Sequence, residues 1–172
     1  MDNTKWHQAL KEIYSKVQNR YQSGVRDLNQ IVTDQEAMAL AELGLRPIHV
    51  FDHVDDFARY GEPDWETFLL VASARRDYLL WHMNRAPASH IIRAEDLPPK
   101  NQELEGIPWL PRIVTKAQAF LEGSLSDDFM YGCGGDREFL RKFNIHAADF
   151  LRLVWACHGD PVKVLARLTN HP

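Results

Sequence analysis

Three glycines surround one cysteine in the stretch Gly132-Cys133-Gly134-Gly135-Asp136, just before an expected helix. Glycines let backbone N–H groups turn toward one point, and the start of a helix attracts negative charge. Both effects would stabilise a thiolate on Cys133, and Arg137 adds a positive charge beside it. The pattern indicates a reactive thiolate or an anion-binding turn. The favoured alternative is a tight turn in which Cys133 is a small buried residue, because the sequence places no general base nearby.

Arg75, Arg76 and His82 fall within a long apolar helix expected from Trp65 to about Asn84. Each arginine shares a helical stripe with apolar residues, so at least one guanidinium should point inward. A buried guanidinium needs a carboxylate or a ligand anion as its partner. One hypothesis is therefore an anion clamp, which His82 would join. The favoured alternative is an internal ion pair, with these candidate acids: Asp136, Glu66 and Asp55.

Two histidines, His49 and His53, are spaced to share one face of a helix, with Asp52 and Asp56 beside them. Two imidazoles four residues apart can hold a divalent metal ion. The sequence offers no committed third ligand, so a metal site is the weaker hypothesis. The favoured interpretation is a solvated polar face, opposite an apolar stripe made of Ile48, Phe51, Val54 and Phe57.

The start of the next expected helix carries Trp109 between Pro108 and Pro111, followed by Arg112 and Lys116. We expect Trp109 to anchor the core. Arg112 and Lys116 are spaced to share a helix face that could serve an acidic partner, and a solvated face is the favoured interpretation.

Composition sets limits on the class of protein. The chain has 172 residues, 45% of them hydrophobic, a net charge of −4 and a pI near 6.0, which argues against general nucleic-acid binding. The two cysteines do not form a disulfide framework. The longest apolar run, Phe68–Ala72, is far too short to span a membrane, and the first residues lack the apolar core of a signal peptide. We therefore expect a cytoplasmic protein that does not enter membranes.

The long periodic segments have the helical period, which predicts an all-α fold of seven to eight helices. The expected helices follow one another along the chain: 4–22, 34–43, 47–60, 65–84, 109–122, a short one capped by Asp136, 145–155 and 161–168. A loop from Arg85 to Glu105 is longer than most connections within a domain. It divides the prediction into an N-terminal segment, residues 1–94, and a C-terminal segment, residues 95–172, which we expect to pack as one globule.

The C-terminal segment resembles an uncharacterised bacterial family known as domain of unknown function 5069. The resemblance covers roughly Asp96 to Leu168 and rests on these residues: Asp96-Leu97-Pro98-Pro99, Leu110-Pro111-Arg112, Lys116, Leu121, Gly123, Cys133, Asp136, Phe139-Leu140, Ile145 and Ala148-Asp149-Phe150-Leu151. It differs at Gly134-Gly135, where the family often carries other residues. The resemblance implies an all-α, cytoplasmic protein and supplies no catalytic residues.

The leading hypothesis is a small helical binding module for a protein partner or a small anionic ligand. Its site would lie where Arg75, Arg76, Tyr78 and His82 meet the turn from Cys133 to Arg137. The first alternative is a thiol-dependent enzyme or redox protein that uses Cys133. The second is a metalloprotein that uses His49 and His53. We expect no cofactor, and the sequence leaves enzymatic activity, the partner and the oligomeric state open.

Overall fold

The computed structural model describes residues 3–86 and 88–170. The predicted all-α class is confirmed, because this part of the chain forms nine α-helices, eight of them seven residues or longer, and only a small two-stranded sheet. The chain divides into two compact units, Met1–Arg76 and Asp77–Pro172. The division into segments at residue 94 stays a prediction.

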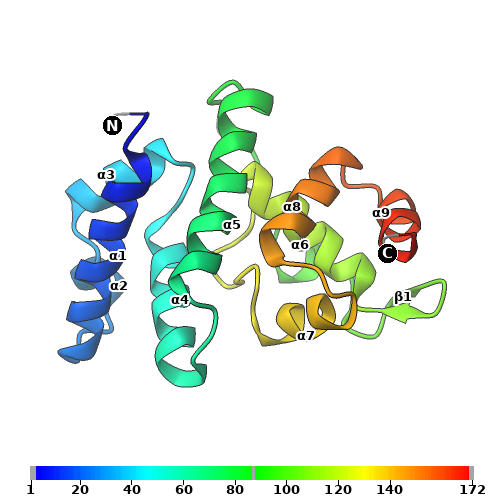
Figure 1. Cartoon of the computed structure of the whole chain (residues 1–172), viewed down its shortest axis with the longest axis horizontal. Coiled ribbons are helices and arrows are strands. Elements are labelled where there is room, and N and C mark those ends of the chain that lie inside the picture. Colours follow the sequence, from blue (N-terminus) through cyan, green and yellow to red (C-terminus); the bar gives the residue numbers. More distant parts are fainter. Residues whose placement is uncertain (1–2, 87, 171–172) are drawn as a thin grey trace. The chain divides into compact units, whose positions relative to one another are not determined.

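The N-terminal unit is built around contacts between its first and fourth helices (Figure 1). Its helices are α1 (Trp6–Gln22), α2 (Leu28–Ile31), α3 (Asp34–Glu42), α4 (Pro47–Tyr60) and α5 (Trp65–Asp77). The core stripe of α1 follows the helical period and consists of Leu10, Ile13, Tyr14, Val17 and Tyr21. The short helix α2 packs on both α1 and α4, so it closes one side of this pair.

A capping box starts α3. The Thr33 side chain accepts from the Glu36 N–H, and the Glu36 carboxylate accepts from the Thr33 N–H. The same carboxylate binds the Arg20 guanidinium through two hydrogen bonds, of 2.6 and 3.0 Å. Burial opposes ionisation of Glu36, but the bonds from Arg20 and Thr33 outweigh it and lower the pKa of Glu36.

The C-terminal unit surrounds α6, which contacts α8, α9, η1 and β1 (Figure 1). Its elements are the π-helix η1 (Tyr78–His82), the 3-10 helix η2 (Ala94–Asp96), the antiparallel strands β1 (Glu103–Leu104) and β2 (Ile107–Pro108), and the helices α6 (Leu110–Glu122), α7 (Gly134–Lys142), α8 (Ala147–Ala156) and α9 (Pro161–Thr169). Both α7 and α9 pack on α8. The core therefore collects on the buried sides of α6 and α8.

Several local features differ from the sequence expectation. The helix expected to run regularly from residue 65 to 84 is α-helical only to Asp77 and then widens into a π-helical turn. The β1–β2 hairpin and the short helices α2 and η2 were not expected. Helix α7 begins earlier than predicted, because Cys133 and not Asp136 is its N-cap residue.

The interpretation of α4 as having a solvated histidine face is wrong. His49 and His53 are buried together with Val50 and Val54, whereas Phe57 is exposed. The helix is therefore rotated about its axis from the predicted position.

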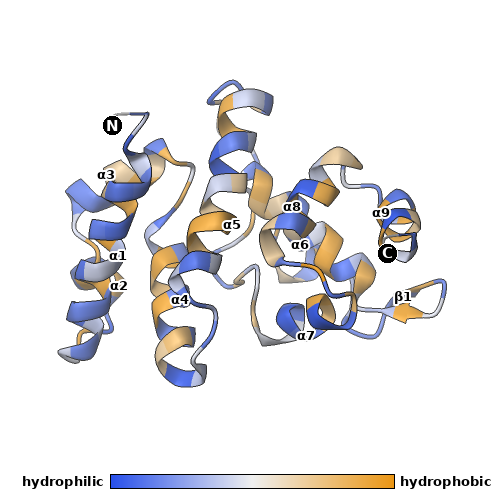
Figure 2. Cartoon of the chain, in the orientation of Figure 1, coloured by the Kyte–Doolittle hydropathy of each residue, from blue (hydrophilic) through white to orange (hydrophobic). Residues whose placement is uncertain are grey.

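Figure 2 shows hydrophobic and hydrophilic residues interspersed along the helices. Over the described ranges, no helix is long and apolar enough to cross a membrane.

Candidate functional site

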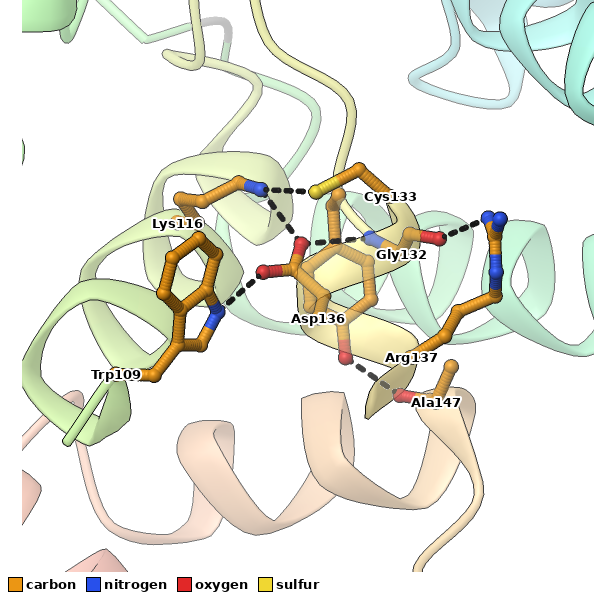
Figure 3. A network of polar contacts seen from close by, with 8 residues as sticks. Trp109, Lys116, Gly132, Cys133, Asp136, Arg137 and Ala147 are labelled. Carbon is orange, nitrogen blue, oxygen red and sulfur yellow. Dashed lines mark hydrogen bonds and ion pairs between the residues drawn. The ribbon is translucent and has the colours of Figure 1, made fainter. Parts of the chain in front are cut away.

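The carboxylate of Asp136 lies at the centre of a buried polar cluster in the C-terminal unit (Figure 3). Its side chain has no exposed surface. Oδ1 accepts from Trp109 Nε1 at 2.9 Å, and Oδ2 accepts from Lys116 Nζ at 2.6 Å and from the Gly132 N–H at 3.0 Å. Three donors thus compensate for the loss of water around one buried charge.

The start of α7 explains how Asp136 reaches this position. With Cys133 as N-cap, Asp136 occupies the first turn of the helix, where a negative charge is favoured by the unpaired N–H groups. From there the carboxylate reaches back to the Gly132 N–H. Gly132 has φ of +85°, a conformation that other residues rarely adopt. The glycine turn therefore directs its backbone donor at a side chain of its own helix.

Lys116 is the residue whose environment differs most from the expectation. It lies on the buried stripe of α6 between Ile113 and Phe120 and is only 2% exposed. The interpretation of this position as part of a solvated face is therefore wrong. An ammonium group this deep in the protein requires a counter-charge, and Asp136 supplies it. Arg112, by contrast, is half-buried and donates to the Pro98 carbonyl at 2.7 Å.

The indole of Trp109 packs directly against Gly135. A Cβ added to Gly135 would lie 2.7 Å from the Trp109 ring, closer than side chains in proteins approach. The close contact with Trp109 therefore requires a glycine at position 135. A Cβ added to Gly134 would lie 4.0 Å from its nearest neighbouring atom. Trp109 itself has a backbone φ of +70° at the start of α6, and its indole N–H donates to Asp136. The glycine and the indole together bring the starts of α6 and α7 into contact.

Cys133 joins the cluster through its sulfur. Lys116 Nζ donates to Cys133 Sγ at 3.3 Å while it also donates to Asp136. Cys133 is half-buried, which differs from the favoured interpretation as a small buried residue. The second cysteine, Cys157, is 1% exposed. A cation therefore contacts the sulfur of the less buried of the two cysteines.

Two further residues hold the turn in place. Arg137 Nη1 donates to the Gly132 carbonyl at 2.8 Å, and Figure 3 shows its side chain extending away from the Cys133 sulfur. Tyr131 is buried and its hydroxyl donates to the Ala147 carbonyl at 2.8 Å. Burial, and secondarily the charge of Asp136, raise the pKa of Tyr131 well above 10.0. Tyr131 is therefore neutral and links the turn to the start of α8, and the Arg137 guanidinium binds a backbone carbonyl of the turn.

At least one of the two arginines was predicted to point inward, and both are buried, with Arg75 3% and Arg76 9% exposed. The Arg75 guanidinium lies against Gly44, where an added Cβ would be 2.9 Å from its Cζ. Arg76 donates to Asn3 Oδ1 at 3.0 Å and lies over the Trp6 ring. Both sets of contacts lie within the N-terminal unit. The predicted site that joins these arginines to the Cys133–Arg137 turn stays a prediction.

His82 belongs to the C-terminal unit and is exposed. Its ring lies 4.5 Å from that of Tyr78 and 6.2 Å from that of Trp155, measured between ring centroids. The Tyr78 hydroxyl in turn accepts from Gln118 at 3.1 Å. His82 thus covers an aromatic cluster, and its place in an anion site also stays a prediction.

His49 and His53 make bonds to the backbone of α4. His49 Nδ1 accepts from the Arg46 N–H at 3.2 Å, and His53 Nδ1 lies 2.8 Å from the His49 carbonyl oxygen. Burial lowers the pKa of His49 well below 6.5, and the charges of Arg46, His53 and Arg75 act in the same direction. Among the described residues, no group of three potential metal ligands comes together. The pair therefore has a structural environment.

The cluster from Trp109 to Arg137 lies within a stretch that a family model covers. Residues 95–172 match the family described as Domain of unknown function (DUF5069). The match confirms the resemblance seen in the sequence and extends over the whole cluster. The chain matches none of the curated proteins and none of the solved structures.

Trp109 and Lys116 are members of the cluster that sequence reasoning did not assign to it. A signal for Lys116 was present, because the residue falls on the apolar stripe of its helix, a position where a lysine needs a partner. A signal for Trp109 is harder to find, since its N–H meets an acid 27 residues further along the chain.

Proposed function

We propose that the C-terminal unit acts through Cys133 as a reactive thiol in redox chemistry. The observation that carries this proposal is the buried ammonium of Lys116, which donates to Cys133 Sγ at 3.3 Å. Reactive cysteines occur in partly exposed, electropositive surroundings, whereas inert structural cysteines are buried. Cys133 fits the first description and Cys157 fits the second.

The sulfur of Cys133 contacts a cation that also holds a carboxylate. The Lys116 ammonium donates to the sulfur, and Cys133 is the N-cap residue of α7, although its side chain accepts no hydrogen bond from the N–H groups of that turn. The Asp136 carboxylate shares the same ammonium and repels a second negative charge. The Trp109 and Gly132 N–H groups also donate to Asp136, so Lys116 is not the only partner of this carboxylate.

The contacts of Cys133 favour redox chemistry over acyl transfer. Cysteine hydrolases and transferases pair the thiol with a general base, most often a histidine. In the described part of the chain, the side chain that hydrogen-bonds Cys133 is Lys116, which is paired with an acid and is a poor base. Attack on a peroxide or a disulfide needs only the thiolate. We therefore propose small electrophiles of this kind as the substrate class.

The rate of alkylation by iodoacetamide at pH 7 tests the proposal, with glutathione as a reference thiol and Cys157 as an internal reference. We expect Cys133 to be alkylated faster than either reference. Replacement Lys116→Met should slow this reaction at pH 7 by at least about tenfold, whereas Lys142→Met, on the exposed side of α7, should leave it unchanged.

In the wild-type chain, alkylation of Cys133 at pH 7 that is no faster than that of glutathione would overturn the proposal. This result does not depend on whether the Lys116→Met chain folds. Peptide mapping after alkylation distinguishes the two cysteines, since they lie in different tryptic peptides.

The binding module expected from the sequence is a second candidate function, for which exposed apolar side chains are the favourable observation. Trp81 is 75% exposed and Ile91 is 50% exposed, both in the C-terminal unit. Replacement Trp81→Ala should then weaken association with a protein partner, or of the chain with itself, in sedimentation velocity. The matched control is Tyr60→Ala, at a side chain that is 65% exposed in the N-terminal unit. Equal sedimentation of the two variants and the wild-type chain would remove this support.

A further inference from the structure

We propose that Lys116 is the resolving group for oxidised Cys133, and that a peroxide converts the pair into a covalent sulfur–nitrogen bond. This inference rests on the proposed function, because Cys133 must first react as a thiolate. It adds the oxidant class, the product and a role for Lys116. The oxidised form would be a reversible switch state of the cluster.

The geometry singles out an amine as the nearest group that could react with the sulfur. Lys116 Nζ lies 3.3 Å from Cys133 Sγ, within contact distance. The ammonium is 2% exposed, and its position is fixed by a 2.6 Å bond to Asp136. Cys157, which carries the other thiol, is the C-cap residue of α8 and is buried. The group in contact with the Cys133 sulfur is therefore the nitrogen of Lys116 and not a second thiol.

The first step oxidises the sulfur by two electrons. The Cys133 thiolate attacks the terminal oxygen of a hydroperoxide, so that an S–O bond forms and the O–O bond breaks. The alkoxide or hydroxide that leaves takes a proton from water and departs as an alcohol or as water. Cys133 becomes a sulfenic acid; the residue is only half-buried, and we take its sulfur to be within reach of a small peroxide.

The second step uses the ion pair. Asp136 Oδ2, 2.6 Å from Nζ, accepts one proton from the Lys116 ammonium. The freed amine attacks the sulfur of the sulfenic acid, which forms the S–N bond and breaks the S–O bond. The departing hydroxide takes a second proton from the nitrogen and leaves as water. The products are a neutral sulfenamide, a protonated Asp136 and one water, so that atoms and charge balance without further oxidant.

The consequence is a change of charge in the core. Two charges, one positive and one negative, are replaced by neutral groups, while the Trp109 N–H still faces the Asp136 carboxyl. Burying neutral groups costs less than burying ions. The oxidised cluster is therefore expected to persist until a thiol attacks the sulfur and restores both side chains.

The test is treatment of the full chain with hydrogen peroxide, followed by trypsin and mass spectrometry. A lysine bound to sulfur is not cleaved. We expect one peptide from Ile113 to Arg137 that is lighter than its reduced sequence by about 2 Da and cannot be alkylated. In the reduced chain the same stretch gives two peptides, separated after Lys116. Dithiothreitol should restore both peptides and the free thiol.

Two variants control the assignment. In Cys157→Ser the loss of about 2 Da should remain, which excludes a disulfide between the two cysteines. In Lys116→Arg, which keeps a positive charge beside Asp136, Cys133 should instead become trappable by dimedone and proceed to the sulfinic acid. The matched control Lys142→Arg should behave as the wild-type chain.

Three results separate the inference from the proposed function. Rapid oxidation of Cys133 that yields only sulfenic and sulfinic acids in the wild-type chain would overturn the role of Lys116 and leave the reactive thiol intact. A linked peptide that disappears in Cys157→Ser would overturn it as well. If Cys133 reacted no faster than Cys157 with iodoacetamide and with peroxide, the proposed function would be overturned, and the inference with it.

Discussion

Replacement of Asp136 by asparagine tests how much the buried ion pair contributes to stability. The substitution removes one charge but keeps the size of the side chain. Lys116, which is 2% exposed, would then be a buried ammonium without its counter-charge, and the asparagine N–H₂ would face the N–H of Trp109 or the Lys116 ammonium. Breaking a buried pair in this way costs about 3–5 kcal/mol.

The assay is urea unfolding followed by circular dichroism. With a slope of about 1–3 kcal/mol per molar urea, a loss of 3 kcal/mol lowers the midpoint by about 1 M or more. The matched control is Glu138→Gln, which breaks the pair between Glu138 and Lys142. Its side chains are 67% and 66% exposed and 3.2 Å apart, so the expected loss is below about 0.5 kcal/mol.

The double variant Lys116→Met, Asp136→Asn completes the measurement. Removing both charges leaves no unpaired ion, so we expect the double variant to lose at least about 2 kcal/mol less than the sum of the single losses. Equal losses in Asp136→Asn and Glu138→Gln, or a strictly additive cycle, would refute the view that the pair is energetically coupled.

Two further predictions concern packing and pH. Gly135→Ala should lower the free energy of unfolding by about 1–3 kcal/mol, because the new methyl group meets the Trp109 ring, whereas Gly134→Ala should be neutral or stabilising; equal urea midpoints would contradict the close contact. The stability of the N-terminal unit should fall as pH drops below 6.5, since the unfolded chain takes up a proton at His49 that the folded chain, with its lowered pKa, does not. The free energy of unfolding changes by at most about 1.4 kcal/mol per pH unit for this one group. His49→Asn, which keeps an acceptor for the Arg46 N–H, should reduce the change of the urea midpoint between pH 7.5 and 5.5. An unchanged pH dependence in this variant would show that His49 does not cause it.

The fold class could be read from the sequence because helical periodicity is a local signal. The stripe of α1, from Leu10 to Tyr21, repeats at the helical spacing and is buried. The capping box of Thr33 and Glu36 is equally local, because both partners lie within four residues. The widening at Tyr78–His82 has no equally local signal, and a regular helix was expected there.

The side of a helix that becomes buried was harder to predict where the residues are ambivalent. In α4 the apolar stripe containing Ile48 and Phe51 looked like the core, but His49 and His53 are the residues that are buried. A histidine can be buried when it is neutral and its nitrogens have partners, and here the backbone supplies them. Hydrophobicity alone does not contain this information.

The candidate site was located by its glycines and cysteine, but its chemistry depends on a residue from another helix. The Cys133–Arg137 turn was identified from composition, whereas Lys116 lies 17 residues before Cys133 and enters only through the packing of α6. The sequence indicated Arg137 as the nearby cation, yet Arg137 binds a carbonyl. Which cation meets the sulfur is decided by tertiary contacts.

The arrangement of Asp136 has a consequence for how such a chain can diverge. One carboxylate receives donors from Trp109 and Lys116, at the start of α6 and within it, and from Gly132, just before α7. A descendant that exchanges the aspartate for a neutral residue retains an interior cation unless the lysine changes too. These positions are therefore expected to be kept or lost together in related chains, and a lineage that gives up the acid should give up the lysine beside its cysteine as well.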